Sequence, residues 1–273
     1  MLKSIRCFAL VTMLAPGWAH ADLRNFVDVC GNPETPALDV VTMCQRALDT
    51  GKLGPTAAAQ VRANLGIGFH ELGQFEDAVA EFTRALETAP RMIDLYVNRA
   101  RSYEKLRRLS EAAADYNEAI RIDQTSADAY LNRGVMLLNN GDPARAAQDF
   151  SIVIELQPQW ISPYFNRGVA LFNLGEMVSA DQDFSVVIQR SPRDAAAYLN
   201  RGRVRAAIGR ADAGIDFDRA LEIDPEWGGG WFARGQYYDT LGNREAANQV
   251  FVRAYELGYP DPWLLRRIRE ISG

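Results

Sequence analysis

Residues 130–134 read Tyr-Leu-Asn-Arg-Gly, residues 164–168 read Tyr-Phe-Asn-Arg-Gly and residues 198–202 read Tyr-Leu-Asn-Arg-Gly, so the motif returns every 34 residues. A unit of this length is too small to bury an apolar face of its own, and it must stack on copies of itself. The period therefore predicts a solenoid. Because solenoids present long curved surfaces to other molecules, it also favours a binding function over a catalytic one.

Each unit predicts two amphipathic helices joined by a short turn. The fourth position is aromatic in five of six copies, at Tyr96, Tyr130, Tyr164, Tyr198 and Trp231. The eighth position is small, which lets two backbones approach closely, at Gly66, Ala100, Gly134, Gly168, Gly202 and Gly235. A glycine follows in the turn of five copies, with Arg107 as the departure. In the second helix, alternating small and large residues at spacings of four and three form one buried stripe.

These positions resemble the consensus of the tetratricopeptide repeat (TPR). The resemblance covers 59–258, in copies at about 59–92, 93–126, 127–160, 161–194, 195–227 and 228–258. It implies an all-α, right-handed α-solenoid of about six helix pairs. The fifth copy is one residue short near Ala211–Gly214, and Arg205 replaces an aromatic residue of other copies, so we expect weaker packing there.

Both ends of the chain depart from the repeat. Residues 1–21 combine Lys3 and Arg6 with a short apolar run and an Ala-His-Ala ending, which is typical of a cleaved secretory signal peptide. We expect an N-terminal cap over 22–58, with an irregular segment at 22–31 and a degenerate half repeat whose helix spans 36–48. A capping helix is expected over 259–273, with one apolar side formed by Leu264, Leu265, Ile268 and Ile271.

Two cysteines, Cys30 and Cys44, remain after the predicted signal peptide. An even pair in an exported protein favours a disulfide, with two free buried thiols as the alternative. A bridge closing 13 intervening residues would contribute roughly 3 kcal/mol in the loop-entropy description. We expect no metal site, because two cysteines and one histidine cannot fill the four positions of a structural zinc site. The predicted signal peptide, with no eukaryotic retention signal at the C-terminus, predicts the periplasm of a Gram-negative bacterium as the compartment.

The resemblance implies that the first helix of each unit lines a concave groove. An asparagine recurs there at Asn64, Asn98, Asn132, Asn166 and Asn200. An amide both donates and accepts hydrogen bonds, so this row could hold the backbone of an extended peptide. The alternative, in which each asparagine bonds to a neighbouring helix, remains open at this stage.

The middle of the groove is predicted to be apolar. Its floor comprises Leu131, Val135, Leu138, Phe165, Val169 and Phe172, with Arg101 on one side and Arg203 on the other. A contiguous exposed apolar surface on a soluble protein usually indicates a binding site. We therefore expect an extended or helical peptide to lie over the third and fourth units.

Another recurring pair is interpreted as structural. An arginine at the seventh position faces an acidic residue sixteen positions later in most copies, as in Arg99 and Asp115 or Arg167 and Asp183. Such spacing predicts an ion pair that joins the two helices of a unit. In the first copy Leu65 replaces the arginine, and Glu81 stands at the acidic position.

The remaining composition excludes several function classes. The net charge is −5, and acidic and basic residues alternate along the chain, which argues against nucleic acid or an anionic membrane as partner. No phosphate loop, nucleophile motif or metal-ligand cluster occurs, so we predict no catalytic residues and no cofactor. The sequence predicts a non-catalytic periplasmic scaffold that binds a protein or peptide. The alternatives are a self-associating structural protein and an accessory subunit of an envelope enzyme or secretion complex.

Overall fold

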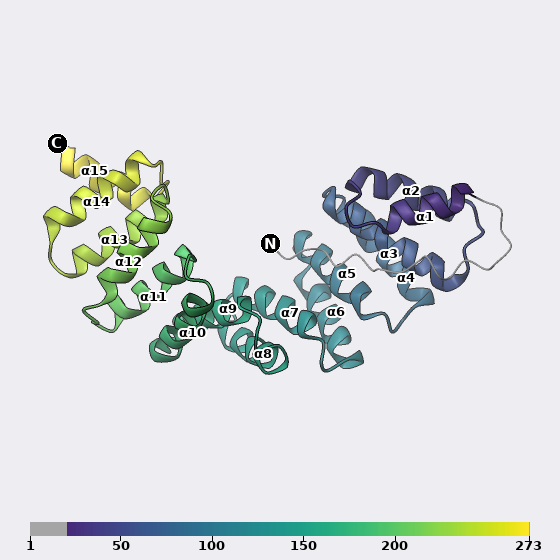
Figure 1. Ribbon diagram of the computed structural model, residues 1–273, viewed down its shortest axis with the longest axis horizontal. Helices are drawn as coiled ribbons and strands as arrows, with labels where there is room; N and C mark the ends of the chain where they lie inside the picture. The colour runs from purple at the N-terminus through teal and green to yellow at the C-terminus, as the bar shows by residue number, and fades with distance from the viewer. Residues whose placement is uncertain (1–20, 273) are drawn as a thin grey trace. The chain divides into compact units, whose positions relative to one another are not determined.

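The computed structural model describes residues 21–272, and within this range it contains fifteen helices and no strand (Figure 1). The predicted all-α class is confirmed. The predicted signal peptide lies outside the described residues except for Ala21. The chain divides into two compact units, one ending at Arg133 and one beginning at Gly134, and each is described separately.

The first unit consists of six helices and the start of a seventh. Their bounds are α1 Ala21–Gly31, α2 Ala37–Asp49, α3 Pro55–Glu71, α4 Phe75–Thr88, α5 Ile93–Lys105, α6 Leu109–Ile122 and α7 Ala127–Asn139. Helix α1 packs on α2 and α3, and each helix from α2 to α6 packs on its neighbours in sequence within this range. The expectation that 22–31 is irregular is wrong, because this segment is helical. Its apolar residues Leu23, Val27 and Cys30 share one face and are buried.

The second unit contains the rest of α7 and eight further helices. These are α8 Pro143–Leu156, α9 Ser162–Asn173, α10 Met177–Arg190, α11 Ala195–Ala207, α12 Ala213–Ile223, α13 Gly228–Thr240, α14 Arg244–Glu256 and α15 Pro262–Ser272. Helix α15 packs on α14, with Leu264 fully buried and Ile268 half-buried against the last core cluster. Leu265 departs from the predicted apolar side, because it is 40% exposed.

The two helices of a pair meet where the eighth-position residue faces an aromatic ring. A Cβ atom added to Gly168 would lie 3.0 Å from the Phe184 ring, and one added to Gly66 would lie 2.7 Å from the Phe82 ring. Both rings are almost completely buried. The missing side chain thus lets the ring rest directly on the backbone of the first helix, as the spacing predicts.

Backbone geometry explains the turn glycines. Gly73, Gly141, Gly175, Gly209 and Gly242 all have positive φ angles, between 71° and 82°. Glycine adopts this left-handed conformation without steric cost and therefore ends the first helix of each pair. Arg107 occupies the same position in the second copy and has a φ of 60°. Among the described residues, it is the one non-glycine residue with a positive φ angle.

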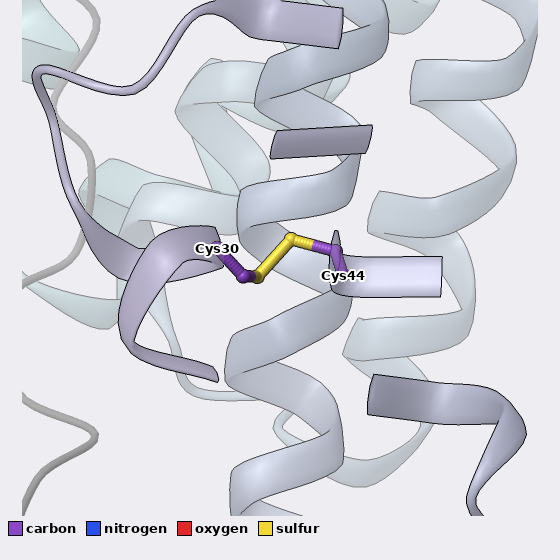
Figure 2. Close-up of a disulfide and its surroundings, with 2 residues drawn as sticks. All are labelled: Cys30 and Cys44. Atoms are coloured by element: carbon purple, nitrogen blue, oxygen red, sulfur yellow. A yellow bond between two sulfur atoms is a disulfide. The ribbon is translucent and has the colours of Figure 1, made fainter. Parts of the chain in front are cut away.

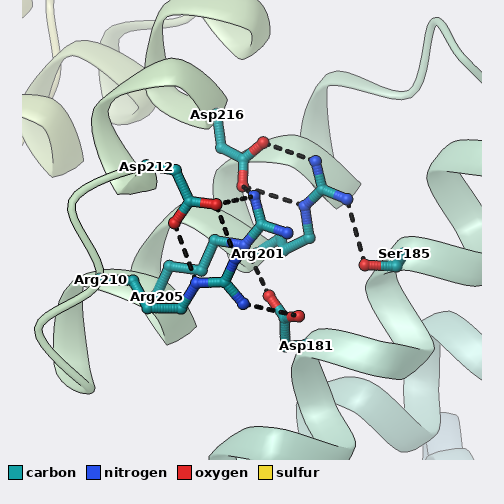
Figure 3. A network of polar contacts seen from close by, with 7 residues as sticks. All are labelled: Asp181, Ser185, Arg201, Arg205, Arg210, Asp212 and Asp216. Carbon is teal, nitrogen blue, oxygen red and sulfur yellow. Dashed lines mark hydrogen bonds and ion pairs between the residues drawn. The ribbon is translucent and has the colours of Figure 1, made fainter.

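The shortened fifth copy is compensated by charged side chains. Helix α12 has 11 residues where α10 has 14, which agrees with a residue missing from the turn or the second helix. The expected weak packing at Arg205 is not what the structure shows. Its side chain is 12% exposed and forms ion pairs with Asp181 at 2.7 Å, Asp216 at 3.0 Å and Asp212 at 3.3 Å (Figure 3). An ionic network thus replaces the aromatic contact.

The predicted disulfide is present. Cys30 at the end of α1 and Cys44 on α2 are bonded and fully buried (Figure 2), and their Cα atoms are 5.1 Å apart. The bridge joins the two helices of the N-terminal pair. Among the residues described, no cluster of three or more metal-ligating side chains occurs, and no helix has the length and apolar character needed to cross a membrane.

Candidate functional site

The seventh-position arginines join the first helix of a pair to its second helix. Arg99, Arg167 and Arg201 each hold both oxygens of a buried aspartate on the paired second helix, at 2.7–2.9 Å. The remaining nitrogen of each donates to a side chain on the preceding second helix, such as Ser151 Oγ for Arg167 at 3.0 Å. Each arginine therefore connects three helices. The predicted ion pair is confirmed at these three positions and is structural.

In the first and last copies, other residues form the ion pair between neighbouring helices. Glu81 accepts from Arg62 at 2.7 Å and also pairs with Arg84, so the missing arginine at Leu65 is replaced from the neighbouring turn. In the last copy, Arg234 pairs with Asp218 on the preceding second helix. Arg62 lies outside the repeated spacing. Asp218, sixteen residues before Arg234, takes the place that Thr83, Ser151 and Ser185 have in other copies, but it alone of these is acidic.

The asparagine row is mostly buried. Asn64 is 0% exposed, Asn98 is 7% exposed and Asn132 is 9% exposed, whereas Asn166 and Asn200 are half-buried. The amide nitrogens of Asn132 and Asn200 donate to carbonyls four residues earlier in their own helices, at 2.7 and 2.9 Å. Such bonds hold the side chain against its own helix and leave its carbonyl oxygen available. Of the row, Asn166 and Asn200 therefore retain the most surface for a ligand.

The predicted apolar floor is partly absorbed into the core. Leu131 is only 2% exposed, so its expected place on an exposed floor is wrong. Phe165 is half-buried and packs edge-on against Phe184, with the ring centroids 5.6 Å apart. Val135, Leu138 and Val169 are half-buried as well. A leucine in the fifth position of a first helix thus packs between helices and contributes core rather than groove.

Phe172 and Arg203 remain together in one cavity of the second unit. This pocket has a volume of about 330 Å³ and lies over the first helices α9, α11 and α13. Its lining residues are Phe172, Arg203, Ala206, Ala207, Phe217, Ala233, Gln236, Tyr237 and Thr240. We refer to it as the Arg203 pocket.

Two small residues create this hollow. Ala206 and Ala207 occupy the twelfth and thirteenth positions of the fifth copy, where the third copy has Leu138 and Asn139. The fourth copy has a phenylalanine, Phe172, at the twelfth position. Because alanine ends at Cβ, the space that a large side chain fills in those copies is empty over α11. The buried ring of Phe217 and the half-buried ring of Tyr237 form the apolar floor, with their centroids 5.3 Å apart.

Arg203 supplies the charge of the pocket. Its guanidinium is half-buried, and burial lowers its pKa, while the Tyr259 phenol acts in the opposite direction. Within the described range, no carboxylate lies at ion-pair distance from it. The pocket thus joins an apolar floor to a cation that has no acidic partner, and at its rim Gln236 and Thr240 are exposed. This combination suits a ligand that is apolar and anionic at once.

In the first unit, Arg101 belongs to a different environment. It lies near His70, Glu104 and Lys105, and its Nη1 is 3.4 Å from the amide oxygen of Asn98. Burial, together with the charges of Arg101 and Lys105, lowers the pKa of His70 to about 4. Burial raises the pKa of Glu104, which accepts a hydrogen bond from the Tyr116 hydroxyl. One carboxyl group, that of Glu104, therefore interacts with Arg101.

A histidine and a serine meet in this cluster without forming a nucleophilic site. His70 Nδ1 lies 2.9 Å from Ser102 Oγ. Ser102, however, is 0% exposed, and its hydroxyl donates to the Asn98 carbonyl at 3.0 Å. The serine proton is therefore engaged by the backbone, and His70 must be the donor in the other bond. A serine nucleophile needs the opposite arrangement, with the histidine accepting its proton.

Family models match two stretches of this chain. One, described as TPR repeat, matches residues 108–141, and one, described as tetratricopeptide repeat, matches residues 229–257. The protein is a tetratricopeptide-repeat protein. The second stretch of this TPR protein covers α13 and α14, whose first helix lines the Arg203 pocket. Comparison with curated protein sequences gives no match.

Solved structures resemble the TPR protein in fold. A tetratricopeptide repeat protein from Parabacteroides merdae is 19% identical, covers 92% of this chain and 98% of its own, and has a TM-score of 0.67. YrrB, a TPR protein with an unusual peptide-binding site, is 23% identical over 69% and 97% of the two chains, with a TM-score of 0.57. PilW, a type IV pilus biogenesis factor, is 19% identical over 77% and 97%, with a TM-score of 0.66. These likenesses confirm the TPR solenoid.

Most pocket residues stand at positions that the repeat assigns to its first-helix surface. Ala206, Ala207, Gln236 and Thr240 occupy the ninth, twelfth or thirteenth position of their copies, as Phe172 and Arg203 do. The sequence pattern does not single them out, because none of them is a large apolar side chain. The signal that could have found the pocket is the pair of alanines, that is, the absence of bulk at positions where neighbouring copies are large.

Proposed function

We propose that this TPR protein is a non-catalytic adaptor of the bacterial periplasm that binds a segment of a partner protein in the Arg203 pocket. The observation that carries the proposal is the pocket itself, in which Phe172, Phe217 and Tyr237 surround space beside an arginine without a carboxylate partner. A TPR fold supports a protein partner in general, and apolar surface beside a few directed polar groups is the usual composition of a binding site.

The half-buried asparagines provide a way to hold the backbone of such a segment. Asn200 lies one helical turn before Arg203 on α11, and its amide nitrogen is already bonded within the helix. Its carbonyl oxygen can accept from a peptide N–H group. Asn166 occupies the equivalent position on α9. Asn98 and Asn132 are not among the proposed contacts with the peptide backbone, because their exposure of 7% and 9% leaves little surface for a ligand.

Two observations support the compartment. The Cys30–Cys44 disulfide fits an oxidising space, where such bonds persist. Residues 1–21 have the composition of a secretory signal. The structural neighbour PilW, described as a type IV pilus biogenesis factor, offers an analogy for work in the cell envelope.

Site-specific photocrosslinking in the cells of origin tests the adaptor function. A benzophenone amino acid replaces Gln236, which is exposed at the pocket rim, and a matched control replaces Gln189, which is exposed on the second helix α10. We expect a specific protein to crosslink at Gln236 but not at Gln189. Its purified segment should then lose at least tenfold in affinity for the Phe172→Ala variant. Crosslinking of equal strength at both positions, or unchanged affinity for Phe172→Ala, would overturn the proposal.

Self-association is a second candidate, favoured by a separate row of exposed apolar residues. Leu174, Ile208 and Leu241 directly follow the first helices of three consecutive pairs and are 41%, 42% and 60% exposed. Apolar residues repeated at one edge could meet the same edge of a second copy. Sedimentation velocity at micromolar concentration tests this candidate. A dimer that dissociates when all three residues become serine would support it, and a wild-type monomer would exclude it.

A further inference from the structure

Arg203 differs from the other half-buried arginines of the second unit. Each of the others forms an ion pair with an aspartate or glutamate, namely Arg167, Arg201, Arg205, Arg234, Arg253 and Arg267. Arg203 is half-buried to a similar degree, yet the described residues offer it no carboxylate. A cation withdrawn from water without a partner costs free energy. The free-energy cost of half-burying the Arg203 guanidinium without a carboxylate points to a ligand that supplies the negative charge.

The space beside the guanidinium specifies the rest of the ligand. The cavity of about 330 Å³ is lined by the rings of Phe172, Phe217 and Tyr237 and widened by the two alanines of α11. Such a volume accommodates one large side chain with its backbone, but not a folded element. Because the arginine and the rings line the same cavity, the anionic group and the apolar group must be neighbours in the ligand.

We propose that the Arg203 pocket recognises an internal acidic–apolar pair in a partner segment. A side-chain carboxylate pairs with Arg203, and the adjacent aromatic or leucine side chain enters the cavity between Phe172 and Tyr237. This inference rests on the proposed adaptor function and adds the residues that the partner must present.

The distribution of polar groups favours an internal pair over a free C-terminus. Asn200 lies one turn before Arg203 on α11, while Gln236 and Thr240 lie at the rim on α13. Amide and hydroxyl groups for a peptide backbone therefore occur on both helices that border the cavity. A segment that continues past the acidic residue in both directions can use them all. A chain that ended at Arg203 would use only one side.

The test uses octapeptides that carry fluorescein at the N-terminus and an amide at the C-terminus. Their central pair is Asp-Phe, Asn-Phe or Asp-Ala in a glycine and serine background, and binding to the full chain is followed by fluorescence anisotropy. We expect Asp-Phe to bind at least tenfold more tightly than either of the others. Equal affinities of Asp-Phe and Asn-Phe, or no binding of any peptide, would overturn the inference.

Variants of the protein assign the effect to the pocket. Arg203→Gln should remove the tenfold advantage of Asp-Phe over Asn-Phe, and Arg203→Lys should keep part of it. Arg193→Gln is the matched control, since Arg193 is exposed outside the pocket and its loss changes the net charge equally. Ala206→Met fills the cavity without removing a charge and should weaken Asp-Phe and Asn-Phe alike. Two results would show that the peptides bind outside the Arg203 pocket. One is that Arg193→Gln removes the advantage of Asp-Phe over Asn-Phe, and the other is that Ala206→Met binds Asp-Phe as tightly as the wild type does.

A fourth peptide separates the two sources of a carboxylate. It ends in phenylalanine with a free α-carboxylate and has no acidic side chain. Tighter binding of this peptide than of the amidated Asp-Phe peptide would refute the internal pair.

The crosslinking experiment keeps this inference distinct from the adaptor function. A partner captured at Gln236 through a segment without an acidic–apolar pair would leave the adaptor in place and overturn only the recognition rule.

Discussion

The guanidinium of Arg201 holds both carboxylate oxygens of Asp216, with Nε 2.9 Å from Oδ2 and Nη2 2.7 Å from Oδ1. Asp216 Oδ2 also accepts from Arg205 at 3.0 Å, and the third nitrogen of Arg201 reaches Ser185 on α10 at 3.1 Å (Figure 3). One carboxylate with 1% residue exposure thus serves two arginines from the neighbouring first helix. The shortened α12 is attached to α10 and α11 through this group.

Replacing Asp216 by asparagine should destabilise the protein by about 2–4 kcal/mol, because two half-buried guanidinium groups would lose their common counter-charge. The free energy of unfolding in urea, followed by circular dichroism, measures this loss. Glu222→Gln is the matched control, because its ion pair with Arg219 is exposed and should contribute less than about 1 kcal/mol. Equal effects of the two substitutions would show that the buried network contributes no more than a surface pair.

The same spacing that reveals the Arg–Asp pair also shows what a repeat can predict. Residues such as Gly168, Phe184 and Asp183 recur in phase, so each copy supplies independent evidence for the same contact. The missing residue of the fifth copy was located for this reason. By contrast, the ion pair of Glu81 with Arg62 occurs once, and a single occurrence carries no periodic signal. The pair of Arg234 with Asp218 keeps the separation that links Arg201 to Ser185, but an acidic residue takes the place of the serine.

Two errors have different physical causes. The repeat does not predict helix α1, although Leu23, Val27 and Cys30 follow a helical period, because the segment lies outside the repeat and is short. Leu131 was assigned to an exposed floor because sequence alone does not tell how deeply a fifth-position side chain inserts between helices. The Arg203 pocket depends on space left by Ala206 and Ala207, and empty space leaves no residue for a pattern search to find.

The turn after α5 predicts a stabilising substitution. Arg107 has a φ of 60°, and a side chain in this region costs about 1–2 kcal/mol relative to glycine. Glycine at this position loses more conformational entropy on folding, so we expect Arg107→Gly to stabilise by about 0.5–1 kcal/mol. Urea unfolding measures the change. Arg108→Gly is the control, because Arg108 has a φ of −89° and should lose stability on the same substitution.

Reduction of the Cys30–Cys44 bond should destabilise the N-terminal helix pair. The bond closes a loop with a sequence separation of 14, which corresponds to roughly 3 kcal/mol in the loop-entropy description. Since neighbouring pairs in a solenoid unfold semi-independently, the loss should be concentrated in α1 and α2. Amide hydrogen exchange with and without a reductant measures it. The Cys30→Ala/Cys44→Ala variant should exchange like the reduced protein and show no response to the reductant.

His70 predicts the direction of a pH effect on stability. Burial and the nearby charges of Arg101 and Lys105 lower its pKa from 6.5 to about 4 in the folded state, while the unfolded chain keeps the ordinary value. The unfolded state therefore binds the proton more tightly. The contribution of His70 to stability is complete above pH 6.5, declines as the pH falls and is lost at about pH 4. Because the ring is partly solvated, we expect the stability to change by about 1–2 kcal/mol over this interval.

An NMR titration of the ring signal that is missing from His70→Gln measures the pKa directly. A midpoint near 6.5 would contradict the burial of the ring against Ser102, and urea unfolding at pH 7.5 and 5 should show a smaller pH dependence in His70→Gln than in the wild type.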